Sequence, residues 1–187
     1  NIYGLGRLGK IEGLVYPYFE QVDELPKGDV VYGLDFGFSD DPAVLVANVI
    51  VGDALYSDEL IYQTGLTNDV LARNMDLLGV KHNYDEIIAD SAEPKSIDEI
   101  RGYGVNIMGV SKTRGESKTE TFVKWSIGVV QGEKISITKR SVNAIKEYRN
   151  LLWLTDKDGR ILNEEDPKCR NDAMSAAAAT LGADPIA

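Results

Sequence analysis

The chain has 187 residues, 43% of them hydrophobic and 27% charged, which is enough to bury the core of one globular domain. No segment approaches the roughly 18–20 apolar residues of a membrane span, and the first ten residues lack the layout of a signal peptide. A single cysteine, Cys169, excludes an internal disulfide, and a single histidine, His82, disfavours a Cys/His zinc site. We therefore expect a single cytoplasmic domain over residues 1–187, and any metal in it to bind oxygen ligands.

The net charge of -10 is unevenly distributed along the chain. Residues 95–149 hold 11 Lys and Arg against 6 Asp and Glu, whereas the rest of the chain holds 9 against 24. The basic middle is compatible with a surface that faces phosphate and equally with ordinary solvated helix faces.

The first half of the chain predicts an arm followed by strands. Residues 1–28 are rich in glycine and aromatic residues and end in the turn LPKGD, which predicts an N-terminal arm or a short first hairpin. From Asp29 onward, VVYGLDFG, AVLVANVIV and ALYSDELIYQ predict three strands, the last two joined by a turn at Gly52 and Asp53. Three successive strands of this kind form an antiparallel meander.

The second half alternates helices and strands. TNDVLARNMDLLGV predicts a helix with Thr67 or Asn68 as its cap, and YDEIIAD and VNIMGV predict strands on either side of the helix SIDEIRGYG. ETFVKWSIGVVQ predicts a helix, ISITKR a strand, SVNAIKEYRNLLW a helix capped by Ser141, residues 155–166 a β-hairpin, and DAMSAAAATLGA a final helix. The predicted class is α/β, a mixed sheet flanked by helices.

Three acids occupy positions suited to a shared metal. Asp35 and Asp90 each end a predicted strand, and Asp172 opens the alanine-rich helix. Each alone is also explained by a turn, a cap or the helix dipole. Carboxylates brought together repel one another unless a cation lies among them, so the set of three predicts a site for Mg²⁺ or Mn²⁺.

Other polar residues leave alternatives open. Asp40 and Asp41 are candidate outer ligands or part of a turn, Glu93 competes with Asp90, and His82 has no evident role. In VSKTRGESKTE, the three cations Lys112, Arg114 and Lys118 follow a predicted strand and form either a contact with a DNA backbone or a solvated loop. The segment GLGRLGK has the glycine and lysine spacing of a phosphate-binding loop, but Ile11 stands in the Ser/Thr position and no strand precedes it.

These segments resemble the C-terminal nuclease domain of the large terminase subunit of tailed bacteriophages. The resemblance covers nearly the whole chain and is carried by YGLGRLGKIEGLVYPYFEQV, GLDFGFSDDPAVLV, IIADSAEPKSIDEIRGYG, VSKTRGESK and NDAMSAAAAT. It implies an RNase H-like fold and an endonuclease that cuts concatemeric double-stranded viral DNA with two Mg²⁺ or Mn²⁺ ions. Asp35, Asp90 and Asp172 would then be the catalytic metal ligands, with Lys112, Arg114 and Lys118 binding DNA.

The resemblance also implies binding partners and a cellular location. The expected partners are double-stranded DNA, an N-terminal ATPase domain that this chain lacks, the portal and the small terminase subunit, with no membrane involved, in the cytoplasm of the host cell. Where the family commonly has a histidine three residues before the last aspartate and Arg-Tyr shortly after it, this chain has Cys169, Ser175 and Ala176.

Three alternatives remain at this point. One is another RNase H-like enzyme, such as a junction resolvase or transposase core. Another is an actin-like or sugar-kinase ATPase, suggested by LDFGFS although such proteins need a second phosphate loop and far more chain. The third is a non-catalytic docking module whose acids are solvated turns.

Overall fold

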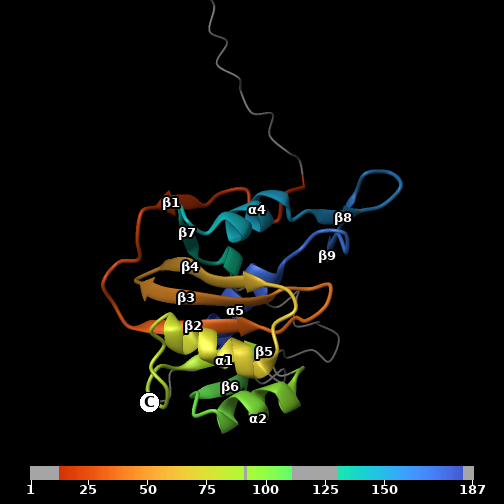
Figure 1. Ribbon diagram of the computed structural model, residues 1–187. Helices are drawn as coiled ribbons and strands as arrows, with labels where there is room; N and C mark the ends of the chain where they lie inside the picture. The colour runs from red at the N-terminus through yellow and green to blue at the C-terminus, as the bar shows by residue number, and fades with distance from the viewer. Residues whose placement is uncertain (1–12, 91, 111–129, 183–187) are drawn as a thin grey trace, which may run out of the picture.

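Seven strands form one mixed sheet in the computed structural model, which describes residues 13–90, 92–110 and 130–182 (Figure 1). Their spatial order is β1-β7-β4-β3-β2-β5-β6. The strands are β1 (Glu20–Val22), β2 (Val30–Asp35), β3 (Ala43–Val51), β4 (Ala54–Gln63), β5 (Ile87–Asp90), β6 (Ile107–Val110) and β7 (Lys134–Thr138).

The predicted meander and the parallel strands after it are confirmed. β2, β3 and β4 pair antiparallel, with Gly52 at φ 64° in the turn between β3 and β4. β5 pairs parallel with β2, and β6 pairs parallel with β5. β7 joins the other side of the meander parallel to β4, and β1 lies parallel to β7 at the edge. Because β1 and β7 run parallel, the described part of the N-terminal arm contributes an edge strand rather than a hairpin.

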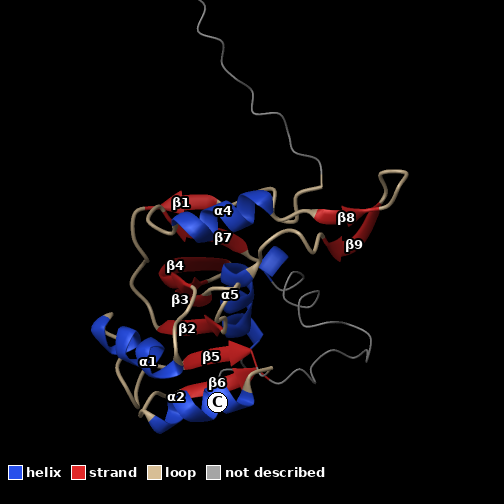
Figure 2. Cartoon of the chain, turned by 45° about the vertical axis from the view of Figure 1, so that its right-hand side comes forward, coloured by secondary structure: helices blue, strands red, loops and turns tan. Residues whose placement is uncertain are grey.

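Helices cover both faces of the sheet (Figure 2). They are α1 (Asn68–Leu77), α2 (Pro94–Gly102), α4 (Val142–Asn150) and α5 (Asp172–Gly182). Alternate residues of β3 show how the faces divide. Leu45 belongs to the buried cluster that includes α1 and α2, whereas Val44 and Val46 belong to the cluster that includes α4 and α5. This period of two is what a strand buried on both faces requires.

A second, two-stranded sheet lies at one side of the molecule (Figure 1). β8 (Trp153–Thr155) and β9 (Ile161–Glu165) pair antiparallel around a turn in which Gly159 has φ 79°. Within the described ranges, no helix is both long and apolar enough to cross a bilayer. The GLGRLGK segment and most of the helix predicted from ETFVKWSIGVVQ fall outside the described residues.

Candidate metal centre

The parallel pairing of β2 and β5 brings two of the predicted acids to one edge of the sheet. Leu34 is paired with Ala89, and the next residue on each strand is Asp35 and Asp90, respectively. Since both strands run in the same direction, their carboxyl ends lie at the same edge. One oxygen of Asp90 also accepts a hydrogen bond from the backbone N–H of Ala92 at 3.0 Å.

Helix α5 brings the third acid to the same edge. The helix crosses β2 so closely that a side chain at Gly33 would overlap the backbone carbonyl of Ala176. Asp172 begins the helix one turn before Ala176, so the two residues lie on the same helix face. Asp35 lies two residues beyond Gly33 and so projects from the same face of the sheet. The close crossing therefore places Asp172 near Asp35.

The electrostatics of the edge reflect this proximity. Burial, followed by the charges of Asp172 and Asp90, raises the pKa of Asp35 well above its usual range. Burial also raises the pKa of Asp172, although the nearby guanidinium of Arg170 opposes the shift. The three carboxylates thus interact through a region where water does not fully screen them, and a bound cation would relieve their repulsion.

The donor atoms at this edge fit a hard divalent cation, because all three side chains offer carboxylate oxygens. The three side chains are not positioned as a preformed metal site. Among the described residues, no three acidic, imidazole or thiolate side chains converge closely enough to hold one ion. Binding a cation would therefore require these carboxylates to be drawn together.

Arg170 is a component of the edge that the sequence did not reveal. One of its guanidinium nitrogens, Nη1, lies 3.3 Å from Asp172 Oδ2 and 3.4 Å from Asp41 Oδ1, while Nη2 donates to the carbonyl of Asp40 at 2.7 Å. It therefore ties the turn after β2 to the start of α5. In this arrangement Asp41 is a partner of Arg170.

Glu147 on α4 is a second residue near the acidic edge that was not predicted from the sequence. Its carboxylate accepts hydrogen bonds from the hydroxyl of Tyr62 and from the backbone N–H of Ala173, both at 2.7 Å. Burial raises its pKa to about 7. A signal was present in the sequence, because Glu147 lies on the helix stripe formed by Ala144, Tyr148 and Leu151, where an apolar residue is expected.

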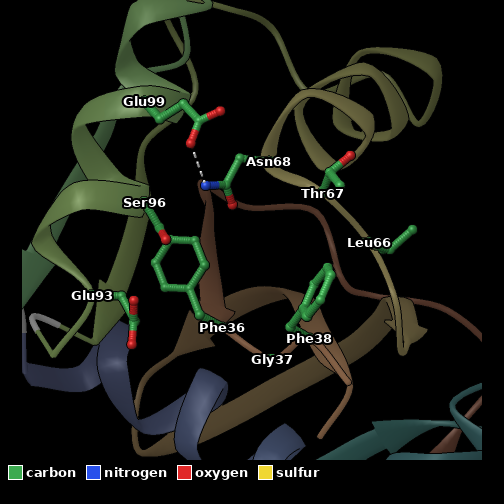
Figure 3. Close-up of a pocket in the computed structure, with 9 residues that line it drawn as sticks. All are labelled: Phe36, Gly37, Phe38, Leu66, Thr67, Asn68, Glu93, Ser96 and Glu99. Atoms are coloured by element: carbon green, nitrogen blue, oxygen red, sulfur yellow. Dashed lines mark hydrogen bonds between the residues drawn. The ribbon is translucent and has the colours of Figure 1, made fainter. Parts of the chain in front are cut away.

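A cleft of about 430 Å³ is lined by Phe36, the residue that directly follows Asp35 (Figure 3). Its walls come from the turn after β2, from the start of α1 and from the first two turns of α2, and Asn68 donates to Glu99 at 2.8 Å between the two helices. The lining has aromatic and polar side chains and two carboxylates: Phe36, Gly37, Phe38, Leu66, Thr67, Asn68, Glu93, Ser96 and Glu99. With two carboxylates and no cationic side chain among its nine lining residues, the cleft does not suit a phosphate group.

Lys112, Arg114 and Lys118 lie outside the described residues. The strand that precedes them ends at Val110, which is paired with Asp90. The described part of the chain before them thus ends at the acidic edge.

The strand order and the helices on both faces define an RNase H-like α/β domain. The chain belongs to the family described as Terminase RNAseH like domain, which matches residues 35–183. It is 28% identical over 179 residues to the PBSX phage terminase large subunit of Bacillus subtilis (strain 168), covering 88% of this chain and 40% of that protein. It is also 29% identical over 137 residues to the large terminase subunit of Bacillus phage SPP1, covering 68% of this chain and 30% of that protein. The chain therefore spans well under half of either relative.

Solved structures share the fold. The nuclease domain of the SPP1 large terminase, determined with bound Mn, has a TM-score of 0.70 and 22% identity, with 88% of this chain and 96% of that chain covered. The large terminase nuclease of the thermophilic phage G20c, determined with bound magnesium, has a TM-score of 0.64 and 13% identity, with 91% and 97% covered. The large terminase of another thermophilic bacteriophage, determined in complex with ADP, has a TM-score of 0.67 and 13% identity, with 94% and 46% covered. The expectation of a terminase nuclease-domain fold is confirmed.

Proposed function

We propose that this domain is the metal-dependent endonuclease of a viral DNA-packaging terminase, which hydrolyses phosphodiester bonds of concatemeric double-stranded DNA. The observation that carries the proposal is the arrival of Asp35, Asp90 and Asp172 at one edge of the sheet from three separate elements. The bound Mn and Mg of the solved nuclease domains support the use of either ion here. Two bound cations would supply an activated water and stabilise the leaving 3′ oxygen.

The chain's own residues have distinct tasks in this proposal. The charges of both other acids act on Asp35, which would be shared by both ions, while Asp90 and Asp172 would each complete one. Arg170 holds Asp172 and the turn after β2 in place. Lys112, Arg114 and Lys118 would bind the DNA backbone without reading its sequence.

Partners follow from the same proposal. The large terminase determined with ADP is about twice as long as the part that this chain matches, which supports a working unit that couples the nuclease to an ATPase domain. We extend the proposal to the portal and the small terminase subunit as further partners, in the host cytoplasm. Membership of the terminase family favours this function over a junction resolvase or transposase core.

A plasmid-cleavage assay tests the proposal. Supercoiled plasmid is incubated at low salt with the protein and Mn²⁺, Mg²⁺ or EDTA, beside the Asp35→Asn variant. Nicking and linearisation that require a cation and are lost in the variant are expected. A folded protein that cuts under neither cation would instead favour the docking module.

A further inference from the structure

Glu147 has an unusual environment for a carboxylate, since only 5% of the residue is exposed. A buried carboxylate is unfavourable unless hydrogen bonds satisfy it. Tyr62 Oη donates to Oε1 and the backbone N–H of Ala173 donates to Oε2. The side chain therefore uses one oxygen for each partner.

The two hydrogen-bond partners of Glu147 lie on the two elements that form the acidic edge, Tyr62 on the sheet and Ala173 on α5. On the sheet, Asp35 is paired with Val44, and Val44 is paired with Tyr62, so Tyr62 stands in the same cross-strand row as Asp35. On α5, Ala173 directly follows Asp172. Glu147 thus connects the row of the sheet that holds Asp35 to the helix turn that holds Asp172.

We infer that Glu147 is a positioning residue that, together with Tyr62, fixes Asp172 relative to Asp35 so that both can bind the same cation. The inference rests on the proposed function and deepens it. Glu147 itself is not a ligand in this arrangement, because a metal bond would break a hydrogen bond that keeps its buried carboxylate satisfied. Residues that orient ligands in this way typically change metal affinity by about 10- to 100-fold when removed.

A matched control exists in the same fold. Glu59 on β4 also caps a helix with its carboxylate, accepting from the backbone N–H of Ala144 and from Asn143 Nδ2, both at 2.7 Å. Its target is the first turn of α4, not α5. Although α4 also carries Glu147, Glu59→Ala removes a carboxylate cap of the same kind while leaving both hydrogen bonds of Glu147 and the helix that carries Asp172 in place.

The test measures Mn²⁺ affinity of the full chain by electron paramagnetic resonance, with thermal unfolding in EDTA as the check on folding. Glu147→Ala is expected to weaken Mn²⁺ binding about 10-fold or more, and Glu59→Ala by less than about twofold, although both lose stability from the lost cap. Glu147→Gln should restore most of the affinity, since its amide can accept from Ala173 and donate to Tyr62. Tyr62→Phe, which removes only a hydroxyl, should weaken Mn²⁺ binding several-fold. This variant tests the inference if Glu147→Ala does not fold.

The outcomes separate this inference from the proposed function. If the wild-type protein binds no Mn²⁺, or if Asp35→Asn binds Mn²⁺ with the same affinity as the wild type, the proposed function is overturned and this inference with it. Wild-type binding that depends on Asp35 but is unchanged in both Glu147→Ala and Tyr62→Phe overturns only the inference. Affinity lost equally in Glu147→Gln and Glu147→Ala would show that the charge of Glu147 matters and would make it a ligand instead.

Discussion

Gly33 on β2 lies directly against the backbone carbonyl of Ala176 on α5, with no room for a side chain between them. The contact sets how closely the helix approaches the strand that ends at Asp35. Because Asp172 lies one turn before Ala176, the same contact sets the distance between two of the three acids of the proposed metal centre.

Gly33→Ala is expected to push α5 away from the sheet. Overpacking of this kind typically costs about 1–3 kcal/mol, and here the obstacle is backbone, which cannot rotate away. Cation-dependent cleavage should fall more than the loss of stability explains, as measured by plasmid cleavage at a temperature where the variant is folded. Gly102→Ala is the control, because nothing lies within 4 Å of the added methyl group and the helix is expected to tolerate it. Equal cleavage by wild type and Gly33→Ala would contradict the positioning of Asp172 by this contact.

Asp35→Asn is expected to abolish cleavage and to stabilise the metal-free protein by on the order of 1 kcal/mol, because the buried charge and its repulsion by Asp172 and Asp90 are removed. The rise in melting temperature that Mn²⁺ produces in the wild type should disappear. Thermal unfolding with EDTA and with Mn²⁺ measures both effects. Asp76→Asn, which changes an exposed acid on α1, should leave them unchanged, and a full Mn²⁺ shift in Asp35→Asn would rule out Asp35 as a ligand.

The stability of the metal-free protein should fall as the pH rises from about 4.5 to about 7 through the titration of Glu147. Burial raises its folded pKa to about 7, against 4.5 for the ordinary side chain. The folded state therefore keeps a proton that the unfolded state has lost, so this contribution is complete below 4.5 and is lost above 7. The total change is on the order of 3 kcal/mol.

Urea unfolding in EDTA between about pH 5 and about pH 8 measures this effect as the difference between wild type and Glu147→Gln. Titration of Asp35 and Asp172, whose pKa values are also raised, occurs in both proteins and is largely removed by the subtraction. A difference that does not change with pH would mean that Glu147 is ionised throughout.

Lys112→Ala, Arg114→Ala and Lys118→Ala are each expected to weaken DNA binding uniformly across sequences. Each lost phosphate contact should reduce the slope of log affinity against log salt by about 1. Fluorescence anisotropy with a labelled duplex in Ca²⁺ or EDTA measures the slope without cleavage. Lys134→Ala is the control, because that lysine pairs with Asp53 at 2.8 Å at the opposite end of the sheet from Asp35. If the salt dependence of DNA binding is unchanged in all three variants, this segment does not contact DNA and the alternative of a solvated loop is favoured.

Patterns that depend on local sequence led to correct predictions. The alternation in β3 and the Gly52 turn predicted the hairpin with β4, and the strand ends at Asp35 and Asp90 followed from where the apolar runs stop. The side chain that caps a helix was harder to predict, because it can come from a distant part of the chain. Ser141 stands at the start of α4 as predicted, but its hydroxyl accepts from the backbone N–H of Glu59, and Glu59 supplies the carboxylate that caps the helix.

The sequence by itself determined the α/β class, the meander and the places of Asp35 and Asp90 at strand ends and of Asp172 at a helix start, because hydrophobic periodicity and turn residues act over short stretches of chain. Only the tertiary structure decided that α5 crosses β2 at Gly33, that Arg170 joins Asp172 to the turn at Asp40 and Asp41, and that Glu147 joins Tyr62 to Ala173. The contacts that cross from one element to another link residues separated by 26 to 143 positions. No local pattern encodes them, since they arise from how the helices pack on the sheet.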